Sequence, residues 1–370
     1  LNNTAFQWED SAIEGGAGGN LIKTLHTRIA TGNPPAAVQM YMGPNVKSWA
    51  EEGVLVDLSA IAMDMNWDSV LPRTIKEHIQ YQGRYYAVPV NAHRINWLWA
   101  NSDILSELGV TPSDSFRDFW LILEKIKKAE YIPIALGGQP WQELTLFEVV
   151  LLGVGGKDFH QRVFVQHDRD AIKSDLMRHI LKEFRRIKKY TDSESLGRNW
   201  DQTTQLVIEG KAAFQFMGDW AKGEFLERGK QTGVDFKCFP SPGTKDYFLI
   251  VTDTFAMFQT GNDSITKGQK TLANTMMNKT LQERFNRIKG SAPARLDIKF
   301  EGFDKCGQES ISALKATAKV DNVIPSFTFY HSSSASMRAG VMELVSVYFN
   351  SNMPVETAIS HLLSLMELAR

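Results

Sequence analysis

Short apolar segments of strand length alternate with longer segments of helical periodicity along nearly all 370 residues of the chain. Apolar spacing predicts helices over residues 20–30 and 113–130, and strands over 37–41 and 131–136. Such alternation is typical of an α/β architecture. The length suffices for two or three domains, yet no linker, internal repeat or low-complexity tract divides it. We therefore expect two interleaved lobes, each crossed by the backbone more than once, with any ligand in the crevice between them.

Three local patterns make sharper predictions. TAFQWED, residues 4–10, has the composition of a short strand. EHIQYQGRYYAVPV alternates around Gln82 and Gly83, which predicts a hairpin. FLIVTDTFAMF, residues 248–258, resembles a hairpin-like pair of apolar strands. Helical periodicity then covers residues 266–289, and two more helices are expected to close the chain.

The balance of charges excludes several classes of partner. The formal net charge is −1 and acids are interspersed with bases, so we expect neither nucleic acid nor an anionic membrane surface as a partner. No run of about eighteen apolar residues exists, so no direct membrane insertion is expected. The first residues, LNNTAFQWED, do not form a signal peptide, which a mature secreted protein would also lack.

Motifs for catalysis or metal binding are absent from the sequence. There is no GxSxG, Walker loop or HExxH, and no pair of carboxylates can be identified as catalytic. GGAGG, residues 15–19, lacks phosphate-loop spacing and is better explained by a turn or close backbone packing. Three histidines, His160, His167 and His179, lie in polar stretches where we expect them to be solvated.

The two cysteines, Cys238 and Cys306, lack the spacing of a zinc site, so no structural metal is expected. Two cysteines fit one disulfide, and they fit two reduced core thiols equally well. Their number alone does not choose between these alternatives.

Amides, carboxylates and bases repeatedly stand beside aromatic residues. Examples are PVNAHRINWLW, GGQPWQE, FMGDWAKGEF, VTDTF and KGSAPARLD. Sugar hydroxyls both donate and accept hydrogen bonds, and the C–H face of a pyranose packs on an indole, so this combination suits carbohydrate. For any single position the plainer alternative is a core tryptophan or a helix cap. Asp219, which precedes Trp220 and a helix, could be such an N-cap.

Several segments, taken together and in order, resemble the signature segments of bacterial ABC-transporter sugar-binding proteins. These segments are ATGNPPAAVQMY, YAVPVNAHRINWLWAN, GGQPWQ, VIEGKAAFQFMGDWAKGEF, TDTFAMF and KGSAPAR. The resemblance covers the chain from about residue 5 to the C-terminal helices. VIEGKAAFQFMGDW resembles a sequence motif of the family 1 extracellular solute-binding proteins. KGSAPAR and GNPPAAVQ resemble the periplasmic glucose-binding branch.

The resemblance implies a maltose-binding-protein-like fold, with two α/β lobes joined by a hinge and closing on a sugar in the interlobe cleft. The N-lobe would comprise residues 1–101 and 250–303, and the C-lobe residues 102–249 and 304–370. The implied protein is a monomeric periplasmic receptor and no enzyme. It would bind a glucose-like monosaccharide without a cofactor and deliver it to an ABC transporter permease.

The resemblance also implies which side chains contact the sugar. The matching positions are Gln39, His93, Trp220, Asp253 and Lys289, with weaker matches at Tyr41, Asn91 and Trp141 and further candidates at Asp219 and His331. Within PVNAHRINWLW, the polar groups before Arg94 would face the ligand. Asn96 would bridge backbone groups behind the site, while Trp97 and Trp99 would pack inside the lobe. Arg94 is left without a role.

The family carries cysteines at both positions that match Cys238 and Cys306, so the resemblance implies a disulfide. This disulfide would tie the regions that connect the two lobes. Closing a loop of this length is worth about 4 kcal/mol in the chain-entropy model.

Two departures from the family pattern bear on ligand binding. TAFQWED matches the second strand of the family, so the first strand, with paired tryptophans and a nearby glutamate, is expected to be missing. The histidine contact of the C-lobe falls near Phe329, with His331 as its stand-in. The alternative function is therefore a degenerate or truncated binding protein with weak or altered specificity. A third, a glycoside-active enzyme, would need two carboxylates about 5 to 9 Å apart across the cleft.

Overall fold

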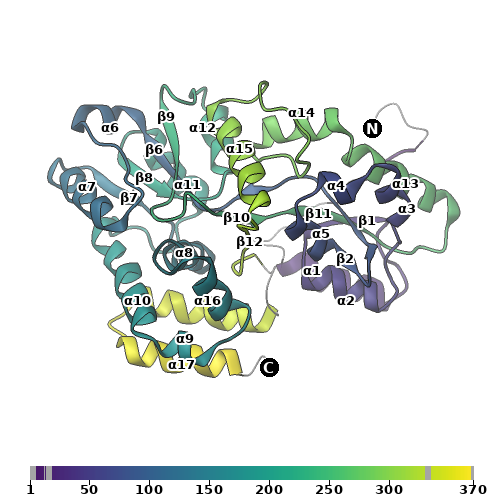
Figure 1. The fold of residues 1–370 in the computed structure, drawn as a ribbon, viewed down its shortest axis with the longest axis horizontal. Coiled ribbons are helices and arrows are strands. Elements are labelled where there is room, and N and C mark those ends of the chain that lie inside the picture. Colours follow the sequence, from purple (N-terminus) through teal and green to yellow (C-terminus); the bar gives the residue numbers. More distant parts are fainter. Residues whose placement is uncertain (1–5, 12, 14–18, 330–334, 368–370) are drawn as a thin grey trace. The chain divides into compact units, whose positions relative to one another are not determined.

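The computed structural model describes residues 6–11, 13, 19–329 and 335–367, and most of its elements are labelled in Figure 1. The chain forms two compact units, each assembled from three separate segments. The first unit comprises Leu1–Ala92, Val251–Asn286 and Pro293–Lys299, and the second His93–Ile250, Arg287–Ala292 and Phe300–Arg370. The lobe boundaries expected from the resemblance stay a prediction.

The first unit is built on an antiparallel sheet of three strands. Its order is β1 (Ala37–Tyr41), β11 (Asp253–Met257) and β4 (Ala87–Pro89). Strand β1 confirms the prediction for 37–41, and its alternation buries Val38 and Met40 while Gln39 faces outward. The helices of this unit are α1 (Gly19–Ala30), α2 (Pro44–Glu51), α3 (Ser59–Asp64), α4 (Trp67–Val70), α5 (Arg73–Ile79), α13 (Asp263–Met276) and most of α14 (Lys279–Lys289).

The predicted hairpin is confirmed by β2 (Gln80–Tyr81) and β3 (Arg84–Tyr85), which pair antiparallel. The two residues between them, Gln82 and Gly83, have φ angles of 48° and 76°. Two consecutive left-handed residues make the turn whose twist matches that of the flanking strands, which explains why the chain reverses here.

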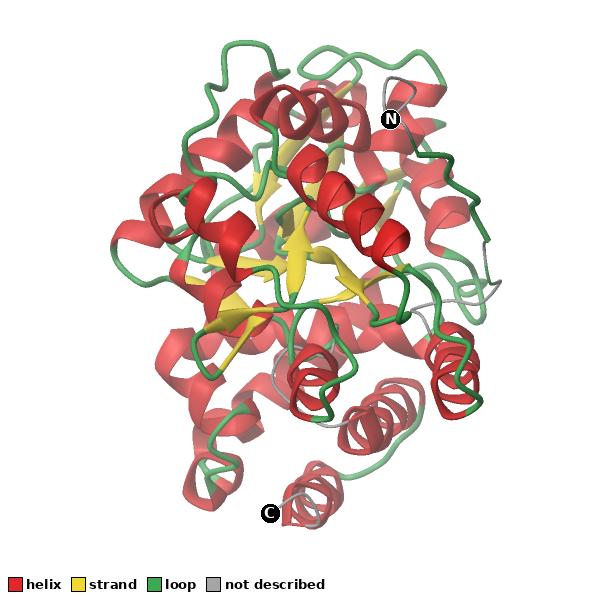
Figure 2. Ribbon diagram, turned by 90° about the vertical axis from the view of Figure 1, so that its right-hand side faces the viewer, coloured by secondary structure: helices red, strands yellow, loops and turns green. Residues whose placement is uncertain are grey.

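The second unit contains two sheets. The larger has the order β7 (Ile132–Ala135), β8 (Ala212–Phe216), β6 (Trp97–Asn101) and β9 (Phe236–Pro240); the smaller has β12 (Val323–Pro325), β10 (Phe248–Val251) and β5 (His93–Arg94). Every residue of β6 and β8 is buried, as expected for strands covered on both faces. Figure 2 shows strands inside and helices outside. The helices are α6 (Ser102–Leu108), α7 (Phe116–Lys128), α8 (Pro140–Phe164), α9 (Arg169–Lys173), α10 (Asp175–Ile187), α11 (Trp200–Ile208), α12 (Ala221–Glu227), α15 (Lys305–Lys319), α16 (Ala335–Asn350) and α17 (Val355–Glu367).

Two strand predictions are wrong. The described part of TAFQWED, residues 6–10, has no regular secondary structure. Residues 248–258 do form two strands, but not a hairpin, because only Thr252 separates them and a reversal needs at least two turn residues. Strand β10 pairs with β12 and β5, whereas β11 pairs with β1 and β4.

The two tryptophans of β6 belong to the core of the second unit. Trp97 and Trp99 are buried among residues that include Phe236 and Cys238. The indole N–H of Trp99 donates to the carbonyl of Met217 at 2.9 Å, so its polar atom is satisfied. This agrees with the expectation that both tryptophans pack inside the lobe.

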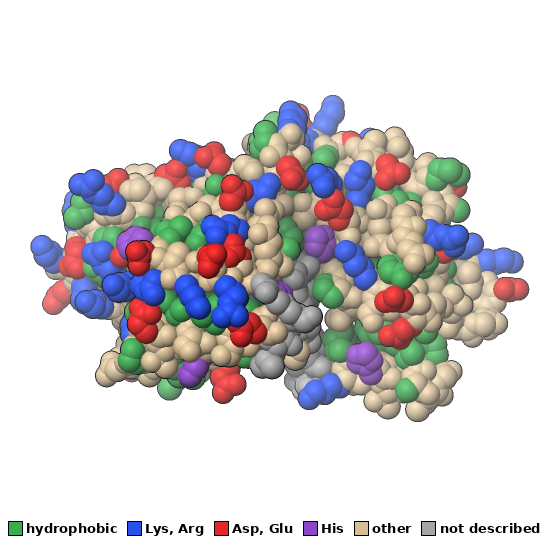
Figure 3. Space-filling model, turned by 60° about the horizontal axis from the view of Figure 1, so that its bottom comes forward, with side chains coloured by type: hydrophobic (Ala, Val, Ile, Leu, Met, Phe, Trp, Pro, Cys, Tyr) green, Lys and Arg blue, Asp and Glu red, His purple; other side chains and the backbone are tan. Residues whose placement is uncertain are grey.

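Acidic and basic side chains lie interspersed on the face drawn in Figure 3. Some charged side chains pair across elements: Arg178 of α10, for example, lies 2.7 Å from Glu356 of α17. Among the described residues, no helix combines the length and the hydropathy that crossing a bilayer requires.

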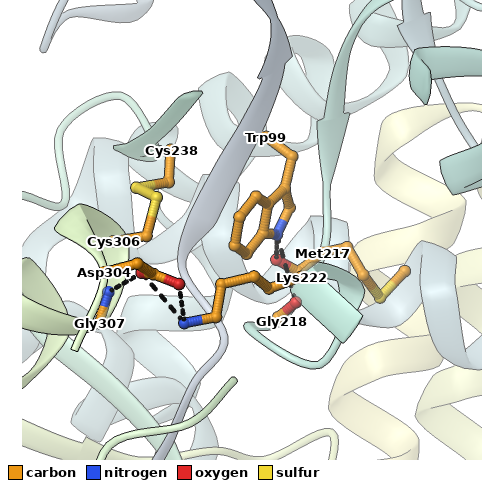
Figure 4. Close-up of a disulfide and its surroundings, with 8 residues drawn as sticks. All are labelled: Trp99, Met217, Gly218, Lys222, Cys238, Asp304, Cys306 and Gly307. Atoms are coloured by element: carbon orange, nitrogen blue, oxygen red, sulfur yellow. Dashed lines mark hydrogen bonds and ion pairs between the residues drawn. A yellow bond between two sulfur atoms is a disulfide. The ribbon is translucent and has the colours of Figure 1, made fainter. Parts of the chain in front are cut away.

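The expected disulfide joins Cys238 of β9 to Cys306 of α15, with Cα atoms 6.0 Å apart (Figure 4). Both cysteines belong to the second unit. That the bond ties the regions connecting the two lobes stays a prediction. Asp304 caps α15 by accepting from Gly307 N at 2.8 Å. The buried Lys222 ammonium lies 3.0 Å from the same carboxylate. The disulfide, the cap and the ion pair thus anchor the start of α15.

Acid should weaken the first unit through Asp297. Its carboxylate accepts two bonds from Arg295, at 2.8 and 2.9 Å, and lies 2.8 Å from the ammonium of Lys279. Chiefly because of Arg295, the pKa of Asp297 is lowered to about 2. A lowered pKa stabilises the folded state above the unfolded value of about 3.9 and loses that contribution as pH falls towards 2. The carboxylate is part-exposed, so we expect only about 1 kcal/mol.

The measurement is the urea unfolding midpoint of the wild type and of Asp297→Asn between pH 5 and 2. The difference between the two should shrink as pH falls from 4 to 2. Asp64→Asn, at an exposed position of α3, is the matched control. A constant difference across this range would contradict the assignment.

Candidate functional site

Four of the predicted contact residues gather in the first unit. Antiparallel pairing of β1 with β11 places Tyr41 opposite Asp253. Gln39 lies two residues along the same face of β1, where its side chain is exposed and that of Tyr41 is partly exposed. Asn91 follows β4, the other neighbour of β11. The sheet therefore brings all four residues together.

The carboxylate of Asp253 is held by the amide of Asn91. Nδ2 of Asn91 donates to Oδ2 of Asp253 at 2.7 Å, and Oδ1 of Asn91 accepts from the Asp253 backbone N–H at 2.9 Å. Asn91 is fully buried, while Asp253 keeps 7% of its surface exposed. Among these two, Asp253 is better placed for a ligand, and Asn91 orients it.

In the second unit, Asp219 links the loop after β8 to strand β5. Its carboxylate accepts from Nδ1 of His93 and from the backbone N–H of Arg94, the latter at 2.8 Å. Its own N–H donates to the carbonyl of Arg94 at 3.0 Å. An ionised carboxylate only accepts hydrogen bonds, so Nδ1 of His93 carries the proton. The N-cap of α12 is Trp220, so the alternative that Asp219 caps this helix is excluded.

An aromatic wall, defined as Trp141, Trp220 and Phe329, lies beside this pair. The ring of Trp220 is 5.4 Å from that of His93 and 5.6 Å from that of Phe329, both edge to face. Phe329 in turn lies 6.2 Å from Trp141. Phe329 is buried, whereas both tryptophans are partly exposed. The wall thus offers indole surface next to the His93–Asp219 pair.

Lys289 ends α14 with an exposed side chain, and the chain then passes against Asp219. Gly290 has a φ of 93°, and a Cβ added there would lie 2.9 Å from the Asp219 carbonyl oxygen. Only glycine fits both the backbone angle and the space. Lys289 is therefore the residue directly before the glycine that packs against the Asp219 loop. His331 lies outside the described residues.

Arg94 acquires a structural place. The residue is buried, with its guanidinium 4.4 Å above the ring of Trp97. Burial lowers the pKa of Arg94 to about 10, against the opposing effect of Glu309 and Asp219. Asn96, as expected, bridges backbone groups: it donates to the carbonyl of Tyr247 and accepts from the N–H of Leu249, both at 3.0 Å.

One histidine expected in solvent is part of the interior. His160 is only 1% exposed, and its Nε2 lies 2.9 Å from Oε1 of Glu148. Sequence reasoning missed this pair, although the apolar run VVLLGVGG before it was a signal of burial. Across the ranges that the structure describes, no cluster of three or more His, Cys, Asp or Glu residues is arranged to hold a metal ion.

Comparison with known proteins gives concordant results. The family model described as bacterial extracellular solute-binding protein matches residues 9–264. A probable sugar-binding periplasmic protein of Brucella melitensis is 35% identical over 370 residues, which are 100% of this chain and 87% of the relative. A protein of Rhizobium meliloti with the same description is also 35% identical, over 100% of this chain and 89% of its own.

Among solved structures, a chitin oligosaccharide binding protein superposes with a TM-score of 0.82 at 20% identity, covering 99% of this chain and 91% of the other. At this identity the likeness concerns the fold alone. It confirms the predicted α/β fold with two lobes.

Proposed function

Because this chain belongs to the family of bacterial extracellular solute-binding proteins, we propose that it is a periplasmic receptor that binds a sugar and delivers it to the permease of an ABC transporter. The observation that carries the proposal is the aromatic wall beside the His93–Asp219 pair. The names of the two relatives, probable sugar-binding periplasmic proteins, support it. They describe binding proteins, so we propose no catalysis.

We further propose that the ligand is a monosaccharide similar to glucose. Indole surface matches the C–H face of a pyranose, and carboxylates accept from its hydroxyls in charge-assisted hydrogen bonds. Within the first unit, Asp253 lies with Gln39 and Tyr41. Within the second unit, Trp220 lies with His93 and Phe329. The segments KGSAPAR and GNPPAAVQ, which resemble the glucose-binding branch, favour glucose among the hexoses.

Isothermal titration of the chain with glucose, galactose and mannose tests the proposal. We expect saturable binding of at least one of these sugars, with glucose the tightest. Preference for another hexose would contradict the glucose assignment alone. If none of the three bound at millimolar concentration, the receptor proposal would fail for this chain, and a degenerate binding protein would be favoured.

Asp253→Asn should weaken sugar binding without unfolding the protein. The substitution keeps the shape of the side chain, and its remaining oxygen can still accept from Nδ2 of Asn91. It removes the charge that strengthens a bond to a sugar hydroxyl, a loss of about 1.5 to 3 kcal/mol or roughly 10- to 150-fold in Kd. Titration measures this loss, and the thermal midpoint should change little.

Asp263→Asn, at an exposed position in the first turn of α13, is the matched control and should bind like the wild type. Wild-type affinity in Asp253→Asn would remove Asp253 from the list of sugar contacts.

A further inference from the structure

Glu148 of α8 is a buried carboxylate with no exposed surface. Its Oε1 accepts from Nε2 of His160 at 2.9 Å and from the N–H of Phe327 at 2.7 Å. Its Oε2 accepts from Oγ of Ser326 at 2.7 Å and from the N–H of Thr328 at 3.1 Å. A buried carboxylate is tolerated only when its oxygens are bonded in this way. Three of the four donors belong to one short segment, residues 326–328.

A kink in α8 makes the pair with His160 feasible. Glu148 and His160 are 12 residues apart, a separation of about 18 Å along a continuous helix. Gly156 interrupts the helix with φ 74° and ψ 178°. The remainder of α8 therefore leaves the axis of its first part, and His160 reaches back to Glu148. A positive φ of this size favours glycine, so the local sequence permits the kink.

The segment that Glu148 holds leads directly into the aromatic wall. Residues 326–328 run from the end of β12 to Phe329. Phe327 stacks on Phe164 at 4.4 Å, and Nη1 of Arg338 donates to the Thr328 carbonyl at 2.9 Å. With both backbone N–H groups of 327 and 328 bound to one carboxylate, the direction of the chain at Phe329 is set.

We propose that Glu148 and His160 are positioning residues of the sugar site: they hold segment 326–328 and so place Phe329 against Trp220 and Trp141. The proposal rests on the proposed function. The ring of Phe329 carries no hydrogen-bonding group. Its position therefore decides how much apolar surface a pyranose meets at the aromatic wall, and through that which epimers the site accepts. Burial raises the pKa of Glu148, but the bonds from His160, Ser326 and Thr328 outweigh it and hold the pKa below its ordinary value, as a charged anchor requires.

Glu148→Gln and His160→Leu test the proposal. In Glu148→Gln, one side-chain oxygen remains for donors that bind two carboxylate oxygens in the wild type. In His160→Leu, the imidazole donor to Glu148 is removed. For both we expect at least a tenfold loss of affinity for the sugar that the wild type binds best. We also expect a changed ratio of affinities among glucose, galactose and mannose, and an altered near-ultraviolet circular dichroism from the tryptophans. His160→Gln, whose amide can donate to Glu148, should restore wild-type behaviour.

Asp158→Asn, exposed on α8, is the control and should change none of these readouts. Equal losses for all three sugars with an unchanged near-ultraviolet spectrum would overturn the proposal, since neither the choice among the sugars nor the packing of the tryptophans would then depend on Glu148. Wild-type affinities and spectrum in Glu148→Gln would overturn it as well. If Glu148→Gln fails to fold, Ser326→Ala, which removes one donor, carries the same test.

The outcome is distinguishable from failure of the proposed function. If the wild type binds no sugar, that function fails, and the spectrum without sugar still decides the positioning role. A spectral change in Glu148→Gln that is absent from His160→Gln supports the positioning role. If Glu148→Gln and the wild type have identical spectra, that role is overturned.

Discussion

Replacing both Cys238 and Cys306 by alanine is expected to lower the free energy of unfolding by about 4 kcal/mol. The disulfide closes a loop between positions separated by 68 residues, which restricts the unfolded chain. It also joins β9 to the first turn of α15, beside the ion pair of buried Lys222 with partly exposed Asp304 (Figure 4). Guanidinium unfolding of the wild type and the double variant measures the loss.

Reduction of the wild type provides the control for this prediction. A reducing agent should lower the wild-type midpoint to that of the double alanine variant, and should leave the variant itself unchanged. A wild-type midpoint that does not respond to complete reduction, verified by thiol titration, would contradict the expected contribution of the disulfide.

Asp219→Ala is expected to cost about 3 kcal/mol of unfolding free energy and to weaken sugar binding at least tenfold. Asp219 is buried, and its removal leaves Nδ1–H of His93 and the backbone N–H of Arg94 without their acceptor. Breaking a buried pair on one side costs more than the pair contributes, because the remaining polar groups stay desolvated. Binding should fall because the imidazole of His93 loses its orientation next to Trp220.

A double-mutant cycle of Asp219→Ala with His93→Ala isolates the interaction between the two side chains. We expect a coupling of at least 1 kcal/mol, measured by denaturant unfolding. Additive effects of the two substitutions would show that the imidazole and the carboxylate act independently. Titration of the folded variants with sugar then separates the effect on binding from the effect on stability.

The local structure of this chain could be predicted largely from its sequence. Apolar periodicity placed strand β1 and helices α1 and α7, and Gln82-Gly83 placed the hairpin, because these features depend on the φ and ψ preferences of neighbouring residues. The signature segments, in their order along the chain, also indicated the family that the comparisons support. Periodicity failed at 248–258, since it detects two apolar strands but carries no information about their partners.

The candidate site could be predicted as a set of residue types, but not as a set of contacts. The aromatic and carboxylate residues were identified in advance, whereas the acceptor of each donor was not. Asn91 meets Asp253 across 162 positions of the chain, and His93 meets Asp219 across 126. Such pairs form only when the sheets bring distant segments together, so no local preference encodes them.

The sequence by itself determined where most helices and strands form, which two cysteines are available for a disulfide, and to which family the chain belongs. Only the tertiary structure decided that Asp219 accepts a hydrogen bond from His93 rather than capping α12. It also decided that Arg94 and His160 are buried, and that Glu148 binds the segment before Phe329. The physical reason is that secondary structure follows from short-range backbone preferences, whereas a buried polar group takes whichever partner the packing of remote segments provides.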